Sequence, residues 1–126
     1  MLEDEEEYRL SKVAKVSSFM YGSDMEIIYS DALAKNERLK NESFDVLIAN
    51  PPYSVKGFLQ TLSNEDRENY ELIEAVDSKS YSKTGAIECF FIERAKQLLK
   101  KDAVVGIIVP SSILKYNTEK MQKAKY

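Results

Sequence analysis

The sequence predicts an α/β fold in which a doubly wound parallel sheet is flanked by helices. Apolar segments of strand length, 44–49 and 103–109, alternate with segments of helical periodicity, 8–21 and 87–99. Both strand segments lack the apolar–polar alternation of a half-buried strand, which is typical of parallel strands covered on both faces. No internal repeat or low-complexity linker divides the 126 residues, so we expect one domain.

The first elements are a helix and a strand. Apolar residues recur at helical intervals over 8–21, and Gly22 follows as a stop signal. The segment "MEIIYS", residues 25–30, is short, β-branched and aromatic, and therefore predicts a strand that ends at Asp31. Residues 32–40 are expected to form a helical turn or two.

The segment 54–83 is long for a connection inside a compact domain and lacks strong periodicity. It contains a weak helical pattern over 65–76, and we interpret it as either mobile or functional. The clearest helix follows, with an apolar stripe of Ile87, Phe90, Phe91, Ala95, Leu98 and Leu99. Pro110 closes the strand 103–109, and Asn117 is expected to cap a last short helix.

The residue types present restrict the chemistry. The chain has no histidine, which excludes Ser–His triads and the usual zinc clusters, so we expect no metal. With one cysteine, Cys89, no internal disulfide can form, which favours a cytoplasmic location. The longest apolar run is too short to cross a membrane, and the acidic start is not a signal peptide.

The net charge of −3 is spread unevenly. Five of the 21 acidic residues lie in 3–7, which leaves 16 acidic against 18 basic residues, or +2, for the rest. From Lys115 onward there are four lysines and one glutamate. We interpret this tail as a solvated helix face rather than a phosphate-binding patch, and charge alone does not indicate a nucleic-acid binder.

Three segments follow predicted strands at their carboxyl ends: Asp31, Asn50–Tyr53 and Pro110–Ser112. Ligands of doubly wound sheets bind outside this edge, so we expect the site there. In "NPPY", residues 50–53, the prolines fix their own φ and push the preceding residue out of the α region. The Asn50 side-chain oxygen and the Pro51 carbonyl can then act as two fixed acceptors, with Tyr53 as a flat aromatic platform.

Two adjacent acceptors match an exocyclic amino group. Accepting both hydrogens of an adenine amino group would concentrate the nitrogen lone pair on one face, where a methyl sulfonium could be attacked without a prior general base. Orienting the two partners can contribute up to about 7–11 kcal/mol. The alternative is that these four residues are only a tight exit from the strand. The chemical hypothesis requires an Asn50 amide that is not turned inward and a Tyr53 ring that is not packed into the interior.

The sequence resembles the N6-adenine DNA methyltransferases of restriction–modification systems. Asn50-Pro51-Pro52-Tyr53 after "FDVLIA" matches their catalytic (Asp/Asn)-Pro-Pro-(Tyr/Phe) motif, and the resemblance extends over nearly the whole chain. It is similar in style to the methylation subunits of type I systems and to fused restriction–methylation enzymes. The resemblance implies S-adenosylmethionine as cofactor, double-stranded DNA with a flipped adenine as substrate, and specificity and restriction subunits as further partners.

The resemblance also assigns roles to residues. Asn50 and Pro51 would bind the target amino group, Pro52 would complete the rigid corner, and Tyr53 would stack on the flipped base. Asp31, together with Asn50, would contact the cofactor. A helix N-cap for residues 32–36 is the alternative for Asp31. Phe91 aligns loosely with a cofactor-pocket helix, although we favour core packing, and Lys56 is interpreted as an exposed lysine rather than a phosphate ligand.

The glycine-rich cofactor loop of the family has no counterpart among the four glycines. We therefore expect the chain to be the central part of a methyltransferase domain, a partial Rossmann-like sheet lacking the first two strands and the final hairpin. Segment 25–30 would then pair directly with 44–49 or associate with another chain as a strand-mediated homo-oligomer.

Two other functional hypotheses remain open. Release-factor glutamine methyltransferases share Asn-Pro-Pro-Tyr and methylate a side-chain amide, although the long segment 54–83 favours the DNA enzymes. The other is a catalytically inactive methyltransferase-like fragment that acts through protein association. On the main interpretation as well, we expect the chain alone to be inactive, because the glycine-rich cofactor loop is missing.

Overall fold

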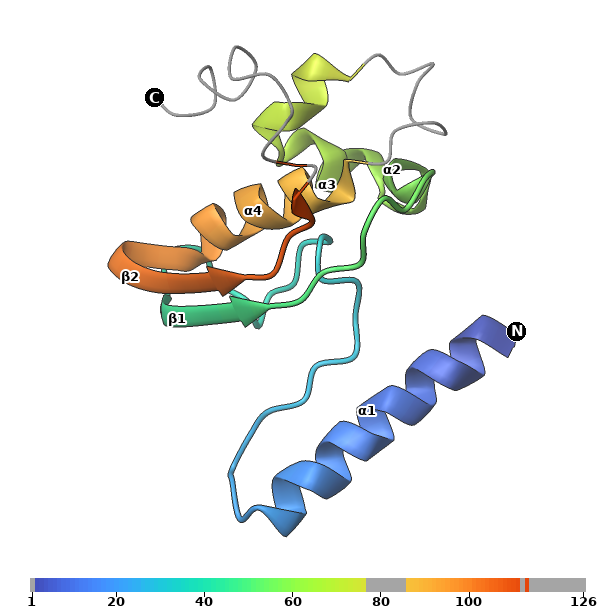
Figure 1. The fold of residues 1–126 in the computed structure, drawn as a ribbon, viewed down its shortest axis with the longest axis vertical. Coiled ribbons are helices and arrows are strands. Elements are labelled where there is room, and N and C mark those ends of the chain that lie inside the picture. Colours follow the sequence, from blue (N-terminus) through green and yellow to red (C-terminus); the bar gives the residue numbers. More distant parts are fainter. Residues whose placement is uncertain (1, 77–85, 112, 114–126) are drawn as a thin grey trace. The chain divides into compact units, whose positions relative to one another are not determined.

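The structure of the chain is a computed structural model and describes residues 2–76, 86–111 and 113. The chain divides into two compact units, Met1–Asp31 and Ala32–Tyr126, which are described separately (Figure 1). The predictions for Ser112, for the end of segment 54–83 and for the basic tail with Asn117 lie outside the described residues.

The first unit contains helix α1, Leu2–Met20, which confirms the predicted helix and begins it earlier. Its end has a Schellman arrangement: the Gly22 N–H donates to the Phe19 carbonyl at 3.1 Å and the Ser23 N–H donates to the Ser18 carbonyl at 3.0 Å. Gly22 has φ 63, the left-handed conformation that this arrangement needs and that glycine adopts without a Cβ penalty. The predicted stop signal therefore has its expected structural basis.

The prediction of a strand at 25–30 is wrong. This segment has no regular secondary structure; Met25 and Tyr29 are exposed, and Ile27 and Ile28 are half-buried. The described sheet contains no strand from this segment, and the expected direct pairing with 44–49, which belongs to the other unit, stays a prediction. β-Propensity alone does not form a strand without a hydrogen-bonded neighbour. The strand-mediated oligomer stays a prediction.

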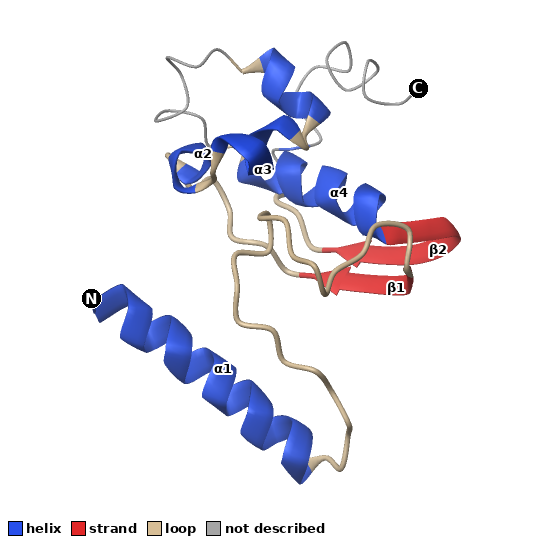
Figure 2. Cartoon of the chain, turned by 180° about the vertical axis from the view of Figure 1, so that it is seen from behind, coloured by secondary structure: helices blue, strands red, loops and turns tan. Residues whose placement is uncertain are grey.

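The second unit contains two parallel strands joined by a helix. Strand β1, Phe44–Ala49, has the predicted bounds, and β2, Leu99–Ile107, begins directly after helix α4, Ile87–Leu98. The register runs from Val46 opposite Val104 to Ala49 opposite Ile107. Figures 1 and 2 show the strands side by side with α4 along one face. This parallel β–α–β arrangement agrees with the predicted α/β class.

The expectation that both strands are covered on both faces is wrong for this chain. Ile48 is 85% exposed, and Val46, Val104 and Ile108 are also exposed. Helix α4 packs on one face of the sheet, and these apolar side chains remain accessible on the other. An uninterrupted apolar run therefore indicates that both faces of a strand are able to be buried. In the second unit, the sheet face opposite α4 remains exposed.

The core of the second unit lies on the other side, between α4 and the described part of the segment 54–83, in which the sequence shows only weak periodicity. Helices α2, Phe58–Thr61, and α3, Asn64–Glu68, and the 3₁₀ helix η1, Glu71–Ala75, fold this segment. The fully buried cluster consists of Leu33, Phe58, Leu59, Leu62, Tyr70, Ile87 and Phe90. The weak pattern over 65–76 is thus confirmed as two short helices. The interpretation of 54–83 as a long insertion after the Asn50–Tyr53 motif, either mobile or functional, stays a prediction.

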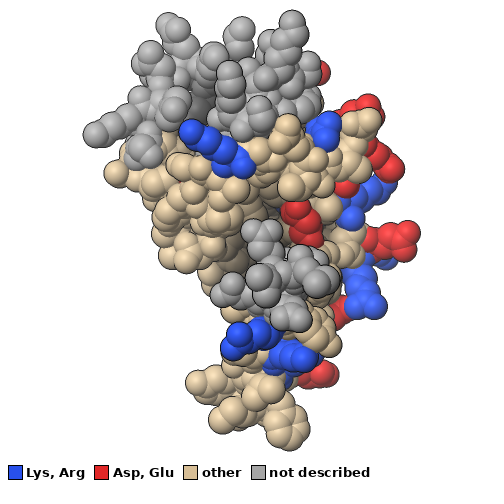
Figure 3. Space-filling model, turned by 90° about the vertical axis from the view of Figure 1, so that its right-hand side faces the viewer, with Lys and Arg blue, Asp and Glu red and all other residues tan. Residues whose placement is uncertain are grey.

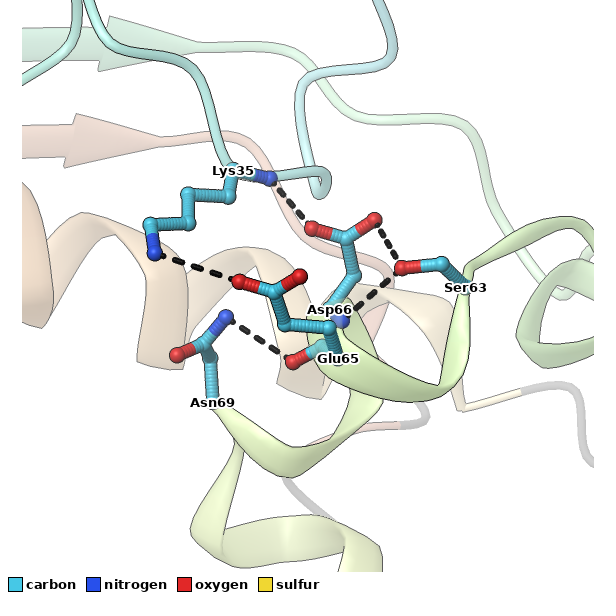
Figure 4. A network of polar contacts seen from close by, with 5 residues as sticks. All are labelled: Lys35, Ser63, Glu65, Asp66 and Asn69. Atoms are coloured by element: carbon cyan, nitrogen blue, oxygen red, sulfur yellow. Dashed lines mark hydrogen bonds and ion pairs between the residues drawn. The ribbon is translucent and has the colours of Figure 1, made fainter.

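A polar network joins the chain near Lys35 to α3 (Figure 4). The Ser63 hydroxyl oxygen caps α3 by accepting from the Asp66 N–H at 3.0 Å, and the Asp66 carboxylate accepts from the Lys35 N–H at 2.7 Å. The Lys35 N–H, and then the Ser63 hydroxyl, which donates to the other oxygen of the Asp66 carboxylate at 2.7 Å, lower the pKa of Asp66. The expectation that residues 32–40 form one or two turns of helix is wrong. They form turns and bends outside any helix, and the Lys35–Asp66 hydrogen bond connects them to α3.

Candidate functional site

The carboxyl ends of β1 and β2 meet at one edge of the sheet because the strands are parallel. The Ile108 N–H donates to the Ala49 carbonyl at 3.0 Å, so the ladder continues to the residue before Asn50. Asn50–Tyr53 and Pro110–Ser111 therefore follow the strands at the same edge, as predicted. Asp31 belongs to the first unit, and the corner is described without it.

The corner Asn50–Tyr53 presents polar and aromatic groups to solvent. Pro51 is buried and fixes the corner, whereas Asn50 and Pro52 are exposed and Tyr53 is 45% exposed. The Tyr53 hydroxyl donates to the Asn50 side-chain oxygen at 3.4 Å, a long hydrogen bond that leaves acceptor capacity on that oxygen. The amide is thus not turned inward, and the ring is not packed into the interior. The conditions stated for the Asn50 amide and the Tyr53 ring are therefore met, and the roles of Asn50, Pro51, Pro52 and Tyr53 stay a prediction.

The chain turns sharply immediately after this corner. Ser54 has φ 53, a left-handed conformation that is unusual for a residue with a side chain. Its N–H donates to the Glu88 carboxylate at 2.7 Å, and Glu88, in the first turn of α4, is only 4% exposed. The sequence reasoning missed Glu88. A signal was present, because Glu88 is three residues before Phe91 and seven before Ala95, so a charged residue lies on the apolar stripe.

Cys89 is the neighbouring reactive group on α4. Burial raises the pKa of its thiol, and the Glu88 carboxylate raises it further. The thiolate is the nucleophilic form, so this environment disfavours a nucleophilic role for Cys89.

The other predicted residues lie as follows. Phe91 is half-buried against the core cluster, which confirms core packing, and Lys56 is exposed. Residues 32–34 form a turn and not a helix, so the N-cap alternative for Asp31 is wrong. Asp31 itself is exposed, and its assignment to the cofactor stays a prediction. Within the described residues, no group of His, Cys, Asp and Glu side chains could hold a metal ion, and no helix could span a bilayer.

A cavity of about 690 Å³ lies away from the corner. It is lined by residues 35–42 and by the carboxyl end of α4, including Arg94 and Gln97. The Glu42 N–H donates to the Gln97 carbonyl, which places the cavity at the amino end of β1. Its basic residues, Lys35, Lys40, Arg94 and Lys96, are matched by Glu37, Glu42, Glu71 and Glu93. The face drawn in Figure 3 likewise mixes both charges, so electrostatics alone marks no phosphate surface here.

Comparison with known proteins connects the corner to a family. Residues 3–126 match the family described as Eco57I restriction-modification methylase. The type II restriction enzyme and methyltransferase RM.Eco57I of Escherichia coli is 32% identical over 82 residues, which cover 65% of this chain and 8% of that protein. The aligned part is thus less than a tenth of the relative's length. No solved structure matches the chain. The comparisons confirm the resemblance to restriction–modification methyltransferases.

Proposed function

We propose that this chain, which belongs to the Eco57I restriction-modification methylase family, carries the target-amine half of an adenine-N6 DNA methyltransferase site. The observation that carries the proposal is the exposed corner Asn50–Tyr53 at the carboxyl edge of the parallel strands. An accessible amide oxygen and an accessible aromatic ring lie together there, at the edge where α/β sheets bind their ligands.

The chain's own residues would act by orientation. The Asn50 side-chain oxygen and the Pro51 carbonyl accept the two hydrogens of the adenine amino group, while the Tyr53 ring stacks on the flipped base. This pairing draws the nitrogen toward a tetrahedral geometry and concentrates its lone pair on one face of the base. Bound S-adenosylmethionine would supply the electrophilic methyl group. The nitrogen would gain the methyl group as the methyl–sulfur bond breaks, and the amino group would release one proton to solvent water.

The exposure of Asn50 at the carboxyl edge of the sheet is compatible with a bound methyl donor. Asn50 is exposed beside the site of the reacting amino group, so a methyl donor can approach it from solvent. Asp31 is proposed to contact the adenine end of the cofactor, and its exposed position at the end of the first unit leaves it accessible. Double-stranded DNA is the proposed substrate, with restriction and specificity subunits as proposed partners.

Methyl transfer tests the proposal against its nearest alternative. Radiolabelled S-adenosylmethionine is incubated with the chain and either an adenine-containing duplex or a glutamine peptide, with Asn50→Leu as the control variant. Because the glycine-rich cofactor loop has no counterpart in this chain, we expect no label from the chain alone. A methyltransferase that contains the chain together with such a loop should label the duplex, and its Asn50→Leu variant should not. Label in the peptide instead would favour glutamine methylation. Calorimetric titration of the cofactor accompanies the assay, since a chain that does not bind it cannot transfer the methyl group.

A further inference from the structure

Glu88 contacts the chain directly after the proposed base platform. Its carboxylate accepts the Ser54 N–H at 2.7 Å across 34 residues of sequence, and Ser54 is the residue that follows Tyr53. Glu88 is 4% exposed. A carboxylate this buried is costly unless its oxygens are hydrogen-bonded. The described residues give Glu88 no ion-pair partner, so the Ser54 N–H and the amino end of α4 are what stabilise its charge.

The Ser54 backbone needs such a partner. At φ 53 its Cβ approaches the following carbonyl oxygen, which makes the conformation unfavourable for serine. Strained backbone of this kind persists only where the surrounding structure holds it. The hydrogen bond to Glu88 is that restraint, because it ties the Ser54 N–H to an acceptor on a regular helix at 2.7 Å.

The result is that Tyr53 is held from both sides. The buried Pro51 and the following Pro52 restrict the backbone before it, and the Glu88–Ser54 hydrogen bond restricts the backbone after it. Tyr53 is 45% exposed, so packing alone does not fix the direction of its side chain. A stacking platform has to be oriented before the base arrives if it is to bind without an ordering cost.

We propose that Glu88 is a positioning residue, which sets the orientation of Tyr53 for base stacking through its hydrogen bond to the Ser54 N–H. The functional half of this inference rests on the proposed function. The geometrical half does not, since the hydrogen bond would orient Tyr53 whatever ligand stacks on it.

Two conservative variants of Glu88 distinguish the effect of its side-chain length on the hydrogen bond from the effect of its charge. Glu88→Gln keeps the length and an acceptor oxygen but removes the charge. Glu88→Asp keeps the charge but withdraws the carboxylate by about 1.5 Å, beyond hydrogen-bond distance. Both variants are made in the 126-residue chain. Circular dichroism and thermal melting of each variant check that the fold is retained.

Two measurements test the positioning role of Glu88 in the absence of any ligand. Amide hydrogen exchange follows Ser54, and fluorine NMR of 3-fluorotyrosine-labelled chain follows Tyr53, whose resonance is assigned by Tyr53→Phe. In Glu88→Asp we expect Ser54 exchange to accelerate at least about tenfold and the Tyr53 resonance to shift or broaden, whereas Glu88→Gln stays near wild type. Unchanged Ser54 exchange and Tyr53 resonance in Glu88→Asp, or perturbation in Glu88→Gln alone, would overturn the positioning role.

Titration with 9-methyladenine then tests the functional half. We expect affinity to fall at least about fivefold in Glu88→Asp and to be retained in Glu88→Gln, because only the first variant loses the platform's orientation. Equal affinity in all three proteins would overturn the role in base binding. A wild-type chain that binds no adenine would contradict the proposed function instead, and the Ser54 and Tyr53 signals would still decide the role of Glu88.

Discussion

Leu59 and Ile48 offer a matched pair of truncations that tests where the core lies. Leu59 is 0% exposed in the cluster between α2 and α4, so Leu59→Ala loses burial and leaves a cavity, at a cost of about 2–5 kcal/mol. Ile48 is 85% exposed on the open sheet face. Complete burial of an isoleucine side chain contributes about 2–3 kcal/mol. The small part of Ile48 that is shielded from water therefore contributes less than about 0.5 kcal/mol.

Urea and thermal unfolding, followed by circular dichroism, measure both values. For a domain of this size, each kcal/mol shifts Tm by about 4–8 °C. We therefore expect Leu59→Ala to lower Tm by at least about 8 °C and Ile48→Ala to lower it by less than about 4 °C. A loss in Ile48→Ala as large as that in Leu59→Ala would refute the open sheet face. A loss below about 1 kcal/mol in Leu59→Ala would refute the core around segment 58–75.

Three further predictions concern single side chains. The lowered pKa of Asp66 means that its contribution to stability is present above about pH 3.8, the ordinary value, and is lost as pH falls through the lower folded value. Asp66→Asn should therefore cost about 1 kcal/mol at pH 7 and flatten the acid limb of a urea-midpoint titration; an unchanged acid limb would contradict the Lys35 and Ser63 hydrogen bonds. The raised pKa of Cys89 predicts slow alkylation by iodoacetamide at pH 8, with a rate still rising above pH 9, the ordinary value; a rate matching N-acetylcysteine would contradict it. Tyr53→Phe keeps the ring and removes a long hydrogen bond, so adenine affinity should change by less than about threefold, whereas Tyr53→Ala should lose at least about tenfold. Equal losses in the two variants would assign binding to the hydroxyl group.

Local signals predicted the elements that depend on local sequence. The Gly22 stop, the bounds of β1 and the α4 helix follow from capping, β-propensity and an apolar stripe, and each is present in the structure. The edge that carries Asn50–Tyr53 was predictable for the same reason, since two parallel strands must end at one edge. The corner residues were found because a diproline turn after a strand is informative without knowledge of the fold.

The errors concern features that depend on distant partners. Segment 25–30 has the composition of a strand, but composition cannot show whether a neighbour is available to pair with it. The core residues Phe58 and Leu59 lie on α2 and Tyr70 directly precedes η1, so they share no single period. Glu88 contacts Ser54 across 34 residues, and only its place on the apolar stripe of α4 hinted at a buried role.

The central claim is that Asn50 and Pro51 accept the amino hydrogens of a base that lies on Tyr53. NMR titration of the chain with 9-methyladenine and with its N6,N6-dimethyl analogue tests it, because the analogue keeps the ring but has no N–H to donate. We predict shifts and intermolecular contacts at Asn50 and Tyr53 with the first ligand, and at least about tenfold weaker binding of the second. Equal binding of the two ligands, or shifts confined to the cavity beside Arg94 and Gln97, would contradict the account.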